Sequence, residues 1–135
     1  MSSERSELAS RCNSIEEAYE FMLAYAAQGL ATDQGSGAGS QLREFLRKSD
    51  AALSGLADLF RELVRSEHVE PAEKYHAFID VLQRDASDAR AAIQLVLAQP
   101  AISSQLVDNL NASIHLRALL TDLFLIDEIL KTTAT

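Results

Sequence analysis

The sequence predicts an all-α protein whose default architecture is an antiparallel four-helix bundle, connected up-down-up-down. Leucine and alanine are the commonest of its 135 residues, tryptophan is absent, and there are only 5 glycines and 2 prolines. Apolar residues recur at helical spacing in four long segments, and β-branched residues never alternate as they would in strands. A chain of this length suits one domain, which we expect at residues 14–131, after an N-terminal segment at 1–13 and before a frayed tail at 132–135.

The first expected helix has a starting signal at Ser14. Ser14 and Glu17 have the spacing of a capping box, in which a hydroxyl and a carboxylate satisfy free backbone N–H groups. The inward-facing apolar stripe then runs from Ile15 to Leu30. The same stripe continues backward, so the helix either begins near Ser3 or follows a short extra helix within residues 1–13.

Three of the five glycines lie in a segment that we expect to be a flexible loop, residues 33–40. A phosphate-binding loop is excluded there, because no Lys-Ser or Lys-Thr pair follows and no strand precedes. The second helix is expected from about Gln41 to Glu67, with the cleanest apolar stripe in the chain, from Leu42 to Val64. Pro71 ends this helix and suits the first turn of the next one.

The third helix keeps one apolar stripe in phase through Asp85–Asp88, which favours a continuous helix. A break at this point is the alternative, because aspartate and serine favour helix caps. Pro100 ends the third helix, and Ser103 or Ser104 is expected to cap the last one.

The last helix contains the most informative stretch, Ile114 to Leu130, which is apolar on nearly every side. One face carries Leu116, Leu119, Leu120, Leu123, Ile126 and Leu130. A second face carries Leu106, Leu110, Phe124 and Leu125, with Ile114 and Ile129 at its margins. A helix at the rim of a small domain needs one apolar stripe. Two faces predict neighbours on two sides: other helices of the chain, a second copy or a different protein.

Among these neighbours we expect a second copy. Two-fold dimers are the commonest oligomers, and their interfaces resemble a core cut in half. The candidate interface residues are Leu116, Leu123 and Leu130 of the last helix, or Phe21 and Tyr25, which lie off the inward stripe of the first helix.

The net charge and the cysteine content argue against several classes of partner and indicate a cellular location. The net charge of −8 opposes binding to nucleic acid or to an anionic membrane, both of which need a basic surface. Cys12 is the single cysteine, so no intramolecular disulfide forms. The polar N-terminus lacks the apolar core of a signal peptide, and no apolar run reaches the length of a membrane span. We therefore expect a cytoplasmic protein.

The sequence offers no catalytic, cofactor or metal site. Glu73 and His76 match the Glu-x-x-His pattern of di-iron bundles, but such sites need two of these pairs and further carboxylates. The helical phase also turns both residues toward solvent. Cys12 has no histidine near it in sequence, and no serine, histidine and aspartate stand in a recognisable catalytic context.

The remaining polar candidates point to binding. One edge of the second helix carries Arg43, Arg47, Arg61 and Arg65, a possible partner site or a mixed, solvated surface. The leading hypothesis is a non-enzymatic protein–protein interaction module: an adaptor, a chaperone-like protein or a regulatory subunit. The rival is a ligand-binding bundle or small enzyme, with a pocket between helices formed by Tyr19, Tyr75, His115 and Arg117.

Overall fold

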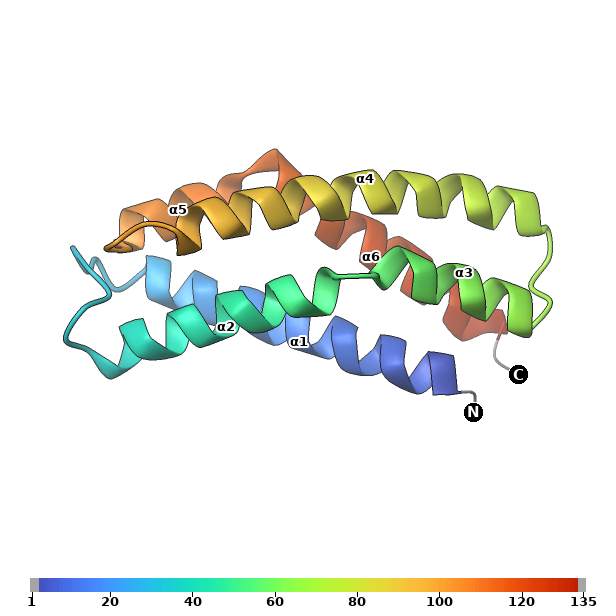
Figure 1. The fold of residues 1–135 in the computed structure, drawn as a ribbon, viewed down its shortest axis with the longest axis horizontal. Coiled ribbons are helices and arrows are strands. Elements are labelled where there is room, and N and C mark those ends of the chain that lie inside the picture. Colours follow the sequence, from blue (N-terminus) through green and yellow to red (C-terminus); the bar gives the residue numbers. More distant parts are fainter. Residues whose placement is uncertain (1–2, 134–135) are drawn as a thin grey trace.

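The structure, a computed structural model, describes residues 3–133, which form six α-helices and no strand (Figure 1). The helices are α1 (Ser3–Ala26), α2 (Gly37–Leu53), α3 (Leu56–Ser66), α4 (Ala72–Leu97), α5 (Ser104–Ala112) and α6 (Ile114–Thr133). The all-helical prediction is confirmed. Of the expected frayed tail, residues 132 and 133 belong to α6, and residues 134–135 lie outside the described part, as do residues 1–2 of the N-terminal segment.

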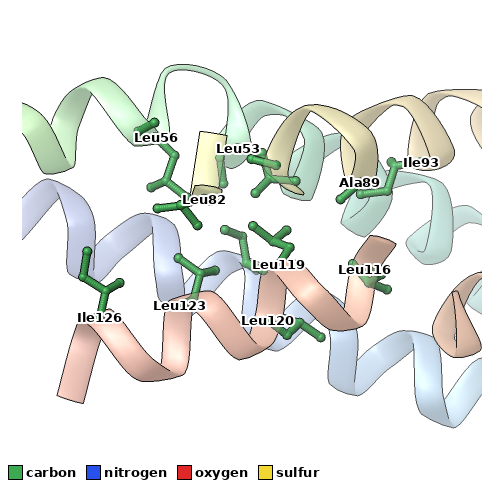
Figure 2. Close-up of a cluster of buried hydrophobic side chains, with 14 of the residues drawn as sticks. Leu53, Leu56, Leu82, Ala89, Ile93, Leu116, Leu119, Leu120, Leu123 and Ile126 are labelled. Carbon is green, nitrogen blue, oxygen red and sulfur yellow. The ribbon is translucent and has the colours of Figure 1, made fainter. Parts of the chain in front are cut away.

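The helices lie side by side along the long axis of the molecule (Figure 1). α3 follows α2 along one row, and α6 follows α5 along another. α1 packs on α2, α3 and α5, whereas α4 packs on α2, α3, α5 and α6. The core fills the space between these rows, and Figure 2 shows Leu82 of α4 pointing toward Leu119 and Leu123 of α6.

α1 is continuous from Ser3, so Ser14 lies inside the helix and does not start it. The predicted capping box is therefore wrong, and the described residues contain no separate N-terminal helix. The reason is burial: Leu8 and Ile15 lie on one buried stripe of α1, which holds both halves of the helix against the core.

The predicted second helix is broken in two at Ser54 and Gly55. Gly55 has a φ of 70°, in the left-handed region that glycine adopts without a steric penalty. The guanidinium of Arg11 donates to the Ala52 and Ser54 carbonyls, which the break leaves without helical partners. The expected single helix is therefore wrong at this point.

The expected flexible loop at 33–40 is also shorter than predicted, because α2 begins at Gly37. Ser36 caps it by accepting a hydrogen bond of 3.0 Å from the Gly39 backbone nitrogen. Gly39 is buried against Asp33, and a Cβ atom there would lie only 1.8 Å from the Asp33 carbonyl oxygen. The glycine therefore permits close backbone packing.

The last predicted helix is broken at Ser113, whose hydroxyl accepts from the His115 backbone nitrogen at 3.2 Å. Ser103 caps α5 by accepting from the Leu106 backbone nitrogen at 3.0 Å, as one of the two predicted caps. The third helix, in contrast, is continuous through Asp85–Asp88, as predicted. Because of the break at Ser113, Leu110 belongs to α5 and not to α6. Part of the second apolar face predicted for the last helix therefore lies on a different helix.

Candidate functional site

The leucines proposed for a dimer interface lie in the core of the chain itself. Leu116, Leu123 and Leu130 are all buried by the protein's own helices. Figure 2 shows Leu116 and Leu123 among the clustered side chains between α4 and α6. A buried leucine cannot contact a second copy without opening the fold, so these three candidates are corrected to core residues.

The two aromatic interface candidates are also engaged within the chain. Tyr25 is fully buried, and its hydroxyl donates a hydrogen bond of 2.8 Å to the Ile102 carbonyl. Phe21 is half-buried and stacks on Phe45 of α2, with ring centroids 4.7 Å apart. Both residues therefore hold the fold together instead of offering a free surface.

The predicted arginine edge is divided among separate intramolecular contacts. Arg43 is turned inward, with Nε 2.5 Å from Asp33 and its two terminal nitrogens donating to the Leu97 and Gln99 carbonyls at 3.1 and 2.9 Å. Its charge and hydrogen bond lower the pKa of the Asp33 carboxyl, against the opposing effect of burial. Arg43 is therefore a structural clamp.

The other three arginines of the edge pair with nearby acids. Arg61 contacts Asp80 of α4 at 2.8 Å, which relieves the like-charge repulsion along the edge. Arg47 pairs with Glu44 at 3.4 Å, and Arg65 pairs with Glu62. Arg47 lies on α2, Arg61 and Arg65 lie on α3, and an acid is paired with each, so these residues form a mixed, solvated surface and not one basic strip.

The four pocket candidates are not brought together. Tyr75 lies near Ile129 at the start of α4, whereas His115 and Arg117 are exposed at the start of α6. The separation of His115 from Ile129 along α6 is roughly 20 Å at the helical rise. Tyr19 is half-buried on α1. The predicted ligand pocket is thus not formed by these residues.

The Glu-x-x-His pair also lacks partners for a metal. Glu73 is exposed and His76 is half-buried. Within residues 3–133 no three histidine, cysteine, aspartate or glutamate side chains are grouped so that they could hold a metal ion. Burial, with smaller effects of Asp127 and Glu16, raises the pKa of the Cys12 thiol to about 12. That thiol is therefore not an activated nucleophile.

The surface that stands out is an apolar groove between α4 and α6. The groove encloses about 330 Å³ and is lined by Lys74, Tyr75, Phe78, Leu125, Ile126 and Ile129. Tyr75 and Phe78 are one turn apart on α4, as Leu125 and Ile129 are on α6, so each wall is a single face of a helix. We refer to this feature as the α4/α6 groove.

One wall of the groove continues into an exposed apolar ridge on α6. Phe124, Leu125 and Ile129 are 57%, 50% and 41% exposed, although each is a large hydrophobic side chain. We refer to these three residues as the α6 ridge. Exposed large apolar side chains that lie close together on one helix are a feature of interaction sites. The sequence places Phe124 and Leu125 on the second apolar face of the last helix and Ile129 at its margin, whereas the dimer candidates predicted on that helix belong to its first face.

Comparisons with known proteins supply no further guide to function. No protein-family model, curated protein or solved structure matches the chain. Within the described part of the chain, no helix has both the length and the apolar character needed to cross a lipid bilayer. The function is therefore argued from the α4/α6 groove and the α6 ridge.

Proposed function

We propose that this protein is a non-enzymatic protein–protein interaction module, of adaptor, chaperone-like or regulatory-subunit type. The observation that carries the proposal is the α6 ridge beside the α4/α6 groove. Exposed phenylalanine, leucine and isoleucine side chains are costly in water, and they are stabilised when a partner covers them. The groove beside them has an apolar lining but no acid–base pair with which to carry out chemistry.

The fold that we propose for the module is an antiparallel four-helix bundle with two broken rods. α1 and α4 form two of the rods, α2 with α3 forms a third, and α5 with α6 forms the fourth. The packing of α1 and α4 on both composite rods supports this assignment.

The proposed occupant of the groove is a second copy of this chain. Leu125 and Ile129 belong both to the ridge and to one wall of the groove, so a two-fold rotation can bring the ridge of each copy against the groove of the other. The groove lining contains Lys74 but no acid. Two chains of net charge −8 can therefore meet there without bringing groove carboxylates face to face.

The net charge and the cysteine content support the class of partner and the cellular location that we propose. A net charge of −8 disfavours nucleic acid and anionic membranes as partners. A single cysteine fits a reducing compartment. We therefore place the protein in the cytoplasm, acting on proteins.

The experiment is a measurement of molar mass by light scattering at about 100 μM, a concentration at which specific dimers are populated. The unmodified chain of 14.8 kDa should show twice its own mass. Leu125→Glu should show a monomer, because it places a charge in the middle of the α6 ridge. Leu95→Glu is the matched control: Leu95 is 65% exposed on α4 but does not line the groove, so this variant should remain dimeric.

A monomeric unmodified protein would overturn the choice of a second copy and leave the ridge for a different protein. A dimer that survives Leu125→Glu would show that another surface is used.

A further inference from the structure

A cavity separate from the α4/α6 groove lies between α1, α3 and α6. In Figure 1 the start of α1, the end of α3 and the end of α6 lie at the same end of the molecule. The cavity there encloses about 570 Å³, and its apolar lining is supplied by Leu8, Cys12, Phe60, Leu63 and Leu130. The four large side chains of this set are buried, whereas Cys12 is half-buried. We refer to this cavity as the α1/α3/α6 pocket.

The packing of the helices accounts for the pocket. Within residues 3–133, α6 packs closely on α4 and α5, whereas α1 and α3 pack closely on each other. The space between these two sets is therefore filled only in part near the end of α6. Protein interiors are close-packed, so an opening of this size is more than loose packing. Its volume lies within the range of roughly 300–1,000 Å³ that is typical of small-molecule sites.

Arg5 of α1 holds the three helices around the pocket. Its Nε and Nη2 atoms donate to the carboxylate of Glu67, the residue after α3, at 2.9 and 2.7 Å. Its Nη1 atom donates to the Leu130 carbonyl of α6 at 3.1 Å. The Arg5 side chain is only 16% exposed. Because this bridge forms without a ligand, the pocket is preorganised and binding needs little rearrangement.

Every charged residue that lines the pocket has an oppositely charged partner there. Arg5 pairs with Glu67 at 2.7 Å. Lys131 pairs with Asp127 at 3.3 Å. Burial raises the pKa of Cys12 to about 12, so its thiol is also uncharged at neutral pH. A charged ligand would have to displace one of these pairs or lie beside a like charge, whereas an uncharged apolar ligand leaves both pairs intact.

We propose that the α1/α3/α6 pocket binds a small, uncharged, apolar organic molecule. The ligand would lie against Leu8 of α1, Phe60 of α3 and Leu130 of α6, where its apolar surface is removed from water. This pocket shares no lining residue with the α4/α6 groove, so the proposal does not depend on dimer formation.

The first test titrates the protein with N-phenyl-1-naphthylamine, an uncharged probe whose fluorescence rises in apolar surroundings. The unmodified protein should bind it saturably, with one probe per chain. Ala9→Phe should remove this binding, because the new ring occupies the pocket. Ala24→Phe is the matched control: both alanines are exposed on α1, but only Ala9 lines the pocket. Circular dichroism checks that each variant folds.

Two outcomes of this titration would overturn the proposal. One is binding that does not saturate, or that is equal in a folded Ala9→Phe variant and in Ala24→Phe. The other is loss of the probe signal in Leu125→Glu, which would place the probe in the α4/α6 groove. The proposal expects Leu125→Glu to bind the probe as the unmodified protein does.

The second test compares two competitors with similar alkyl chains, 1-octanol and octanoate, at neutral pH. Octanol should displace the probe. Octanoate should compete about tenfold more weakly, because its carboxylate would lie beside the acids of the pocket, Glu67 and Asp127. Equal competition by the two compounds would contradict an uncharged ligand.

The third test uses the single cysteine of the unmodified protein and so does not depend on how any variant folds. Cys12 lines the pocket, so a bound molecule should shield its thiol. Saturating octanol should slow modification of native Cys12 by N-ethylmaleimide in proportion to the fraction of chains that are occupied. It should leave the rate for the urea-unfolded chain unchanged. An unchanged rate for the native protein would overturn the proposed site.

Discussion

The buried carboxylate of Asp33 accepts a hydrogen bond of 2.6 Å from the backbone nitrogen of Ile102, 69 residues later in the chain. The carbonyl of Ile102 accepts from the Tyr25 hydroxyl at 2.8 Å. Both backbone polar groups of one buried residue are therefore satisfied by side chains from distant segments. Arg43 joins the same network through Asp33, so this end of the molecule ties α1, α2 and the α4–α5 connection together.

Arg43→Ala should lower the free energy of unfolding by about 3 kcal/mol, because it leaves the Asp33 carboxylate buried without its cation. Arg47→Ala is the matched control on the same helix: its exposed pair with Glu44 is worth at most about 1 kcal/mol. Urea denaturation of the two variants measures the difference. Equal stabilities would mean that Arg43 is no more than a surface residue.

Asp33 should also make the stability of the folded protein depend on pH in the acid range. Arg43 holds the pKa of Asp33 below its ordinary value of 3.8, so the stabilising contribution is present above pH 3.8. It is lost as the pH falls through the lower, folded-state pKa. In thermal melts from pH 5 down to pH 2, the melting temperature of the unmodified protein should fall steeply as the pH is lowered. The melting temperature of Asp33→Asn should fall less steeply. Identical slopes would contradict a depressed pKa.

Core and surface leucines of α4 should respond very differently to truncation. Leu82 is fully buried at the centre of the core in Figure 2, and Leu82→Ala should cost about 2–5 kcal/mol of stability. Leu95 is 65% exposed, and Leu95→Ala should change stability by less than about 0.5 kcal/mol. Guanidinium denaturation compares them. A small loss for Leu82→Ala would mean that this stripe of α4 does not face the core.

The Cys12 thiol should react slowly in the folded protein. Its pKa of about 12, against an ordinary 9.0, lowers the thiolate fraction at pH 8 by roughly a thousandfold. A thiol-specific chromogenic reagent should therefore modify the native protein far more slowly than the urea-unfolded chain at the same pH. Reaction of native Cys12 at the rate of the unfolded chain would contradict this protection.

Helix content was predictable from the sequence because apolar spacing and composition dominate it, and Leu56, Phe60 and Leu82 are buried as their stripes require. The two helix breaks were not predicted, because the buried positions keep phase across them. Leu53 and Leu56 flank the first break and both face the core. Gly55 and Ser113 are residues that favour helix ends, and they are the local signals for the two breaks. The apolar spacing that continues across both positions nevertheless predicts uninterrupted helices.

The candidate site was only partly accessible from sequence. An excess of apolar surface on the last helix was evident, and Phe124, Leu125 and Ile129 belong to it. Which of its two faces turns outward depends on how α6 is rotated against α4, and helical periodicity alone does not fix that rotation. Tyr75 illustrates the same limit, because its place in the α4/α6 groove depends on the residues of α6 that line the other wall.

The central claim, that the α6 ridge of one copy lies in the α4/α6 groove of another, is tested most directly by an isotope-filtered NOE spectrum. The sample mixes labelled and unlabelled chains, so only contacts between copies give cross-peaks. The account predicts cross-peaks from the Leu125 methyl groups of one copy to the Tyr75 or Phe78 ring of the other. A dimeric sample whose intermolecular cross-peaks all arise from other surfaces, or a sample with none, would contradict it.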